Sequence, residues 1–524
     1  PMSDSSPPSP TASAPAAESD AAKRQREAVE RLLAREPARS EGSVTLGGRA
    51  HDYTVHAAFL PVTAGGLGSA GAPVDAAVFT TAYLRKGDDA ASRPVCFAFN
   101  GGPGSASLWL HLGALGPKRV VVGDDGHAPA PPHAVVDNPH SWFEHFDLVF
   151  IDPPHTGWSL AAGDEARKKV LSVDGDVQAL CEVVRVWLTR HQRWGSPVYL
   201  AGESYGTTRG AAIADALQAA GLSLSGVILV SCAMDLQTIV FHRGNDLPYP
   251  LFLPAFANTA QYHGLLKGAL GASSAAARAA AEEYAGGEYL AALHAGSRLT
   301  ATQRSRVARR LAELTGLSPE LIEHHDLRIS DRAFFFEAMR AQGRIVGRLE
   351  SRVTGPMGAT RSREWEFDPG IDAIAGPYRM AAQAYFAGTL GITTDQRYEA
   401  LNVEVNRGWN WNRGEDKGNN FTTTTADLSR AMRRNPHLKV LVASGRYDLG
   451  TPYSATDWSL AQLDIPPDVR ARLTHCYYDA GHMMYTREAD LRQLKADLAA
   501  WLAVRPRARA TRPDRPPSRP SGRR

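Results

Sequence analysis

The chain has 524 residues, and its 43% hydrophobic and 22% charged side chains are those of a globular protein larger than one ordinary core. No stretch approaches the roughly 18 apolar residues of a membrane span, so none is expected. The net charge of the chain is +3, but residues 505–524 alone, with eight arginines and one aspartate, carry +7, so the rest of the chain sums to −4. Because the positive charge lies in this terminal segment, nucleic-acid binding is not expected.

The first segment, residues 1–42, is rich in Pro and Ser and then in helix formers, which predicts a disordered or weakly helical extension. Residues 1–22 lack the apolar centre of a signal peptide, so we expect a cytoplasmic protein. Residues 505–524 predict a solvated, basic Arg/Pro tail. The four cysteines have no paired spacing and predict buried thiols, so no disulfide, metal site or cofactor is expected. The sequence carries no signature of oligomeric state.

Between these ends, short apolar runs alternate with amphipathic helical stretches. The runs lie at 53–62, 76–84, 95–99, 148–151, 198–201, 227–230, 440–443 and 476–478, and helical periodicity is clearest at 176–191 and 206–220. Buried strands alternating with helices predict an α/β fold whose mostly parallel sheet is covered on both faces. Over residues 245–425 helix formers dominate, which predicts a helical insertion, acting as a lid, between two parts of a core at 43–244 and 426–504.

A candidate nucleophile lies in Gly202-Glu203-Ser204-Tyr205-Gly206, directly after the apolar run 197–201 and before a stretch of small residues. This is the strand–sharp turn–helix context in which a serine hydroxyl is lifted off the sheet, and the flanking glycines leave room for the strained turn. A helix-starting serine in a glycine-rich loop would give the same pentapeptide, so the context decides.

A serine nucleophile needs a base and an orienting acid. Asp448 follows the apolar run 440–443, and His482 follows 476–478, so both lie beyond the carboxyl end of a predicted strand, where open parallel sheets bind ligands. The order Ser204, Asp448, His482 is that of α/β-hydrolases. Separately, the aspartate could cap a helix and the histidine could lie in a surface turn. Asp479 is a rival acid, disfavoured because one short loop would carry both groups.

The tetrahedral oxyanion of such a reaction needs hydrogen-bond donors. Asn100-Gly101-Gly102-Pro103-Gly104 follows the strand 95–99, and its glycines allow a backbone to approach substrate closely. We expect the backbone N–H groups of Gly102 and Tyr205 to be the donors. A plain glycine-rich turn is the alternative, and a phosphate loop is disfavoured because no Gly-Lys-Ser/Thr follows.

The ordered set of motifs across residues 95–485 resembles the serine carboxypeptidase family. The matching segments are 100–104, 115–117, 152–159, 202–206, 445–448 and 481–483. The resemblance implies an α/β-hydrolase fold with a helical insertion, carboxypeptidase chemistry at acidic pH, and a Ser204–Asp448–His482 triad. It also implies that Asn100, Gly101 and Glu203 bind substrate, with Asn100 and Glu203 holding the terminal carboxylate. A protonated Glu203 could donate a hydrogen bond to that carboxylate.

The sequence departs from the family pattern at several positions. Ala114 stands where a further carboxylate-binding glutamate is usual, Ser105 where cysteine is frequent, and His155 where glycine is common. Arg209 could compensate as a carboxylate anchor, although an arginine one turn into a buried helix is more often part of a structural ion pair.

The resulting functional hypothesis is a serine carboxypeptidase acting on peptides through an acyl-enzyme. An esterase or acyltransferase using the same triad on a small ester or amide is the alternative, because fold and triad do not fix the substrate. A non-catalytic binding protein on the same fold is the remote alternative.

Overall fold

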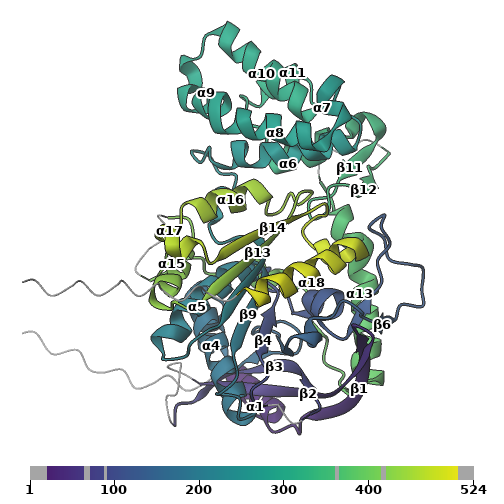
Figure 1. Ribbon diagram of the computed structural model, residues 1–524, viewed down its shortest axis with the longest axis vertical. Helices are drawn as coiled ribbons and strands as arrows, with labels where there is room; N and C mark the ends of the chain where they lie inside the picture. The colour runs from purple at the N-terminus through teal and green to yellow at the C-terminus, as the bar shows by residue number, and fades with distance from the viewer. Residues whose placement is uncertain (1–19, 64–70, 88–90, 360–364, 415–419, 505–524) are drawn as a thin grey trace, which may run out of the picture.

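The computed structural model describes residues 20–63, 71–87, 91–359, 365–414 and 420–504 (Figure 1). Its main sheet has ten strands in the order β1-β2-β3-β7-β4-β9-β10-β13-β14, with β8 paired to β3. The strands are β1 (Ala38–Leu46), β2 (Arg49–Thr63), β3 (Val74–Arg85), β4 (Val95–Phe99), β7 (Asp147–Ile151), β8 (Leu160–Ala161), β9 (Val198–Ser204), β10 (Gly226–Cys232), β13 (Lys439–Gly445) and β14 (Leu473–Tyr478). Two small antiparallel sheets pair β5 (Lys118–Val120) with β6 (Val135–Asp137) and β11 (Arg344–Val346) with β12 (Thr354–Pro356).

The part of the sheet from β7 to β14 is entirely parallel, whereas β1, β2 and β3 pair antiparallel at the other side. Alternate residues of the parallel strands enter different core clusters: Cys96 and Ala98 one, Val95 and Phe97 the other. Both faces are therefore buried, which explains the continuous apolar runs. The predicted α/β fold with a mostly parallel sheet is confirmed, and its topology is that of an α/β-hydrolase.

Helices cover both faces of this sheet. Residues of α4 and α5 share a core cluster with one set of strand residues, and leucines of α18 share the other. The helices of the core are α1 (Asp20–Leu33), α2 (Leu108–Leu110), α3 (Asp164–Val170), α4 (Val173–Arg190), α5 (Tyr205–Ala219), α14 (Val403–Arg407), α15 (Thr425–Arg434), α16 (Tyr453–Ala461), α17 (Pro467–Arg470) and α18 (Glu488–Ala503), with short π or 3-10 turns at His111–Leu115, Trp142–Glu144, Leu236–Thr238 and Met484–Thr486.

Between β10 and β13 the chain forms a helical layer that Figure 1 shows at the far end of the molecule, beyond α16 and β14. This layer has its own hydrophobic cluster, which includes Phe256, Leu311 and Phe334. Its helices are α6 (Pro248–Tyr262), α7 (Gly268–Ala272), α8 (Ser274–Tyr284), α9 (Leu290–Ala295), α10 (Ala301–Thr315), α11 (Pro319–His324) and α12 (Asp331–Glu337), with short turns at Ala285–Tyr289, Gly296–Arg298 and Arg340–Gln342.

The chain returns to the core earlier than the expected insertion boundary at residue 425. Helix α13 (Pro369–Gly388) lies within the predicted insertion, yet Tyr378, Ala381 and Phe386 belong to a core cluster of the main sheet. At the amino end, β1 extends the sheet back to Ala38, ahead of the expected start at 43. Residues 1–19 of the expected extension and the tail 505–524 lie outside the described residues.

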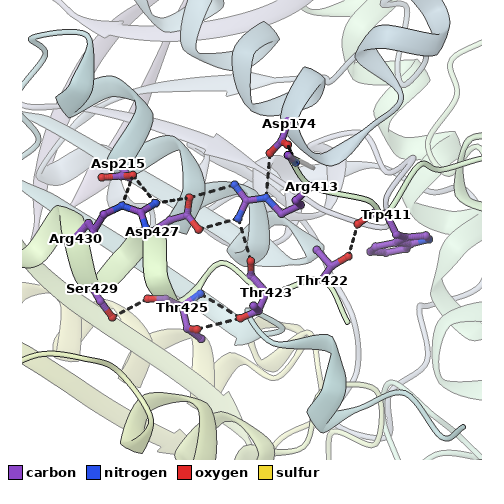
Figure 2. Close-up of polar contacts among 11 residues, drawn as sticks. Asp174, Asp215, Trp411, Arg413, Thr422, Thr423, Thr425, Asp427, Ser429 and Arg430 are labelled. Atoms are coloured by element: carbon purple, nitrogen blue, oxygen red, sulfur yellow. Dashed lines mark hydrogen bonds and ion pairs between the residues drawn. The ribbon is translucent and has the colours of Figure 1, made fainter. Parts of the chain in front are cut away.

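A network of ion pairs attaches the segment after α13 to the core helices. Figure 2 shows the Arg413 guanidinium between Asp174 of α4 and Asp427 of α15, at 3.0 and 2.7 Å. Arg430 of α15 pairs with Asp215 of α5 at 2.9 Å. These contacts join α15 to both helices on one face of the sheet.

The cysteines are unpaired: Cys96, Cys181 and Cys232 are buried and Cys476 is half-buried. Across the described ranges, no group of three or more His, Cys, Asp or Glu side chains is arranged to hold a metal ion. No helix in the part of the chain that the structure describes is long and apolar enough to span a bilayer.

Candidate active site

Ser204 lies at the junction of β9 and α5, and its backbone is strained. Its φ of 60° and ψ of −129° are values that a non-glycine residue adopts only where the surrounding structure holds it. A Cβ on Gly202 would lie 2.1 Å from the carbonyl oxygen of Gly206, and one on Gly206 would lie 2.8 Å from that of Phe99. Strand and helix approach so closely that only glycine fits at these two positions, which leaves the Ser204 side chain partly exposed at the turn.

Asp448 and His482 come together at the ends of β13 and β14. His482 Nδ1 lies 2.8 Å from Asp448 Oδ2. Because an ionised carboxylate only accepts hydrogen bonds, Nδ1 carries the proton and Nε2 is left as a base. The rival Asp479 side chain is 64% exposed and pairs with Arg446 instead, at 3.0 Å.

Thr451, which sequence reasoning gave no role, completes the surroundings of Asp448. Its backbone N–H and that of Gly450 donate to Asp448 Oδ1 at 2.9 and 2.8 Å, and its hydroxyl donates to Oδ2 at 2.7 Å. The adjacency of Asp448, Gly450 and Thr451 in sequence was the available signal, since such a loop can satisfy a buried carboxylate locally.

Strand β10 connects the His482 loop with the turn at Ser204. Ser231 of β10 donates its hydroxyl proton to the His482 carbonyl oxygen at 2.5 Å, and the next residue, Cys232, is paired with Ser204 across the sheet. Among the described residues, no hydrogen bond joins the Ser204 hydroxyl to the His482 ring. In sites without substrate such bonds are often long and tighten only when substrate binds.

The charges of the site influence one another strongly. Burial alone would lower the pKa of His482, but the carboxylate of Asp448 outweighs burial and holds that pKa above its usual 6.5. Burial acts on Asp448 in the opposite direction, and His482 together with the Thr451 donors keeps the Asp448 pKa below 3.8. Asp448 is therefore ionised at any pH at which His482 titrates.

Glu203 and Asn100 lie together directly beside these groups. Burial raises the pKa of Glu203 to about 7, although His482, a hydrogen bond from Tyr485 and one from Asn100 favour the charged form. The Tyr485 hydroxyl donates to Glu203 Oε2 at 2.7 Å, and Asn100 Oδ1 accepts the Leu110 N–H at 3.0 Å. Tyr485 was not identified from the sequence, since nothing in the pattern around it marks a partner 282 residues away.

The glycine loop after β4 packs against the start of α5. A Cβ on Gly101 would lie 2.4 Å from the backbone nitrogen of Tyr205, and Gly102 has a positive φ of 99°. The loop that carries Gly101 and Gly102 and the turn that carries Ser204 and Tyr205 are therefore in direct contact, as an oxyanion site made from Gly102 and Tyr205 requires.

Two positions that the sequence analysis discussed as possible carboxylate-binding sites, Arg209 and Ala114, cannot bind the carboxylate of a substrate in this structure. Arg209 is fully buried and forms a bidentate pair with Asp176, at 2.6 and 3.2 Å, while Nη1 donates to the Asn100 carbonyl oxygen. Its guanidinium is therefore a structural ion pair that supports the Asn100 loop. Ala114 is buried with no polar side chain, and its carbonyl accepts from Asn138 at 2.9 Å.

Two large cavities lie outside this constellation. One, of about 780 Å³, is lined by residues of 239–249 and 325–332, and the other, of about 920 Å³, by residues of 235–237, 411–414 and 420–430 together with Asp174. Neither lining includes Ser204, Asp448 or His482, so these two cavities are separate from the candidate triad.

Comparison with solved structures returns α/β-hydrolases. A peroxisomal alpha-beta-hydrolase from Saccharomyces cerevisiae is 8% identical, covers 88% of this chain and 92% of its own and has a TM-score of 0.38. A proline iminopeptidase from Mycobacterium smegmatis is 14% identical, covers 88% and 97%, and has a TM-score of 0.33. At these scores the fold assignment rests on the strand order and the turn at Ser204 described above.

Sequence comparison finds similarity to one family over part of the chain. Residues 77–236 match the model of the serine carboxypeptidase family. A serine carboxypeptidase-like protein of Arabidopsis thaliana is 30% identical over 115 residues, which cover 21% of this chain and 25% of that protein. Carboxypeptidase Y of Saccharomyces cerevisiae is 29% identical over 119 residues, covering 22% and 20%. The chain matches a quarter or less of the length of these relatives, so the similarity to the serine carboxypeptidase family is shown for residues 77–236.

Proposed function

We propose that this protein is a serine hydrolase of the carboxypeptidase type, which removes C-terminal residues from peptides through an acyl-enzyme on Ser204. The proposal is supported by the strained turn at Ser204 and by the buried His482–Asp448 pair at the neighbouring strand ends. The family match adds support over residues 77–236, which include Ser204.

In the proposed reaction, Ser204 Oγ attacks the carbonyl carbon of the last peptide bond while His482 Nε2 takes the hydroxyl proton. Asp448 holds the imidazole and stabilises the imidazolium. The N–H groups of Gly102 and Tyr205 donate to the oxyanion. His482 then returns the proton to the leaving amine, and a water molecule, activated by the same imidazole, releases the acyl group from Ser204.

The observation that carries the choice of substrate is the buried Glu203 carboxyl group beside Asn100 and His482. With a pKa of about 7, Glu203 is protonated in acid and can donate a hydrogen bond to a substrate carboxylate. Once ionised it repels that carboxylate. Binding of a free C-terminus is therefore expected to be tightest below neutral pH, whereas His482 must lose its proton to act as the base.

The first experiment is labelling of the purified protein with a fluorophosphonate, which reacts with an activated serine. We expect labelling at Ser204 and none in Ser204→Ala. The second compares an N-blocked dipeptide that has a free C-terminal carboxylate with its C-terminal amide. A carboxypeptidase hydrolyses the free acid faster, and equal rates contradict recognition of a terminal carboxylate.

Ala114 favours a second candidate function, an esterase or acyltransferase on the same triad. A glutamate at this position would have supplied a further donor to the substrate carboxylate, and the buried methyl group cannot. On this alternative, small ester substrates without a carboxylate are hydrolysed at least as fast as peptides. The two dipeptides and a matched ester, assayed at one pH, distinguish the functions.

A further inference from the structure

A short segment of the chain beyond the helical layer contacts both loops that carry the acid and the base. This segment, Arg348–Arg352, lies between β11 and β12 and is more than 90 residues distant in sequence from either loop. We define it as the clamp segment. It forms hydrogen bonds with main-chain groups of the two loops, and these bonds restrain the positions of the loops.

The contacts with the base loop are two successive hydrogen bonds. The His482 N–H donates to the Leu349 carbonyl oxygen at 2.6 Å, and the preceding N–H, that of Gly481, donates to Glu350 Oε2 at 2.9 Å. A Cβ on Gly481 would lie 2.2 Å from the Leu349 carbonyl oxygen, so the two backbones touch. Together these contacts fix the peptide plane from which the imidazole projects.

The contacts with the acid loop hold the other side of the pair. The Leu449 N–H, next to Asp448, donates to the Arg348 carbonyl oxygen at 2.9 Å, and the Ser351 N–H donates to the Tyr447 carbonyl oxygen at 3.1 Å. One segment of five residues thus contacts both loops, which also bond to each other directly through the Tyr447 N–H and the Ala480 carbonyl oxygen at 3.0 Å.

Glu350 is itself held by Arg352. Arg352 donates from Nε to Oε1 at 2.8 Å and from Nη2 to Oε2 at 2.6 Å, while its Nη1 donates to the Asp479 carbonyl oxygen at 2.7 Å. The guanidinium also lies over the Tyr447 ring, 4.6 Å from its centroid. The two side chains are only 14% and 11% exposed, so this pair is little weakened by solvent.

We propose that Glu350 is a positioning residue for His482, holding the base loop through the Gly481 amide. This inference rests on the proposed function. Arg352 contacts the loops at Asp479 and Tyr447, and the remaining contacts described above use main-chain groups. Glu350 is the side chain that bonds to the residue directly before His482, so its substitution tests the effect. A charge-assisted hydrogen bond to a backbone amide is a strong, directional restraint, and a displacement of a catalytic group by about 1 Å can cost on the order of 100-fold in rate.

The test measures kcat per active site, with sites counted by fluorophosphonate titration. For Glu350→Ala we expect kcat to fall by about 10- to 100-fold with KM changed less than about threefold, and the labelling rate to fall in parallel. Glu350→Gln keeps one acceptor oxygen for the Gly481 amide, so we expect it to recover most of the lost rate. A purely structural ion pair would instead lower the unfolding temperature and leave kcat per titrated site unchanged.

The matched control is Glu337→Ala, which removes a carboxylate from α12 that pairs with Arg340 at 3.8 Å and does not contact the catalytic loops. We expect its kcat per site to equal that of the wild type. If Glu350→Ala does not fold, Glu350→Met carries the test, because it fills the site but offers the Gly481 amide no oxygen acceptor, and it is expected to lower kcat per site by at least about threefold.

Two results overturn the inference in distinguishable ways. A wild-type protein that is not labelled at Ser204 overturns the proposed function and the role of Glu350 with it. A labelled wild type, together with folded Glu350 variants whose kcat per site and labelling rate match it, overturns the role of Glu350 alone.

Discussion

Two segments that follow the helical layer attach to the core through arginine–carboxylate pairs, and they differ in what they hold. In the network of Figure 2, Arg413 and Arg430 join helices α4, α5 and α15, and several members are open to solvent, with Asp174 41% and Arg430 47% exposed. In the clamp segment, the Glu350–Arg352 pair is largely buried and contacts the loops of His482 and Asp448. The first network bears on how helices pack, and the second on how the atoms of the proposed triad are aligned.

The comparison shows that two arginine–carboxylate pairs can have different consequences, one for stability and the other for the reaction rate. Exposed ion pairs typically contribute about 0–1 kcal/mol each to stability because water and salt screen them. A buried carboxylate bonded to a backbone amide contributes to geometry, and a small displacement there is amplified in the rate. Substitutions in the two regions should therefore separate stability from turnover.

The largest effect on the rate of hydrolysis is expected at the proposed nucleophile, and it sets the scale for the smaller rate effects expected in the clamp segment. Ser204→Ala should reduce hydrolysis by about 10⁴-fold or more, because no other group in the proposed site can form the acyl-enzyme. Its unfolding temperature should stay equal to or above that of the wild type, since the strained backbone at φ 60° is retained. Residual turnover above a tenth of the wild-type rate would contradict the proposed nucleophile.

Arg209→Met should give the largest loss of stability. The change leaves Asp176 buried without its cation, and breaking a buried ion pair costs about 3–5 kcal/mol. Chemical denaturation measures this loss as a decrease in the free energy of unfolding. A decrease in the free energy of unfolding below about 1 kcal/mol would equal that expected for an exposed ion pair, and burial would then not distinguish the Arg209–Asp176 pair from exposed pairs.

Glu203→Gln should change the pH dependence of peptidase activity. In the wild type, the ratio of kcat/KM for a free C-terminus to kcat/KM for its amide is expected to fall as the pH rises through about 7, where Glu203 loses its proton, because ionisation of His482 affects both substrates alike. Glutamine does not ionise, so the variant should lack this decline although its activity in acid is lower. An unchanged pH profile together with unchanged efficiency would show that Glu203 does not bind the carboxylate.

The same substitution tests the Glu203 pKa through stability. The folded state keeps the Glu203 proton up to about pH 7, whereas the unfolded chain releases it near pH 4.5. The wild type therefore loses stability relative to Glu203→Gln as the pH rises from 4.5 to 7, and the difference is constant above that range. Unfolding measured at pH 4.5 and at pH 7.5 for both proteins checks the sign.

The smallest effect is expected at Arg430, the arginine of the network of Figure 2 whose side chain is 47% exposed. Arg430→Met should lower the free energy of unfolding by about 1 kcal/mol, less at high salt, and should leave kcat per titrated site unchanged. A fall in kcat without a fall in stability would show that this network also reaches the catalytic loops, and the comparison of the two regions would then fail.

The sequence predicted the residues whose position follows from strand ends, and it missed those whose role depends on distant contacts. Ser204 ends the parallel strand β9, and Asp448 and His482 follow the parallel strands β13 and β14. The carboxyl ends of parallel strands share one edge of a sheet. Glu350 and Tyr485 have no such relation to a strand, so periodicity and motif could not place them near the loops they touch. Helix α13 was expected in the insertion, although it packs on the main sheet. Helical periodicity shows that one face of a helix is apolar, but it does not show which hydrophobic core that face contacts.

The three fully buried thiols offer a direct report on how the molecule opens. Burial raises the pKa of Cys232 to about 11 and raises those of Cys96 and Cys181 further, so at neutral pH these sulfurs are protonated and shielded. Cys96 and Cys232 belong to sheet strands and Cys181 to α4, so alkylating reagents reach them only when the main body of the fold comes apart. The rate at which iodoacetamide consumes them therefore measures the frequency of large-scale opening, without any probe having to be introduced.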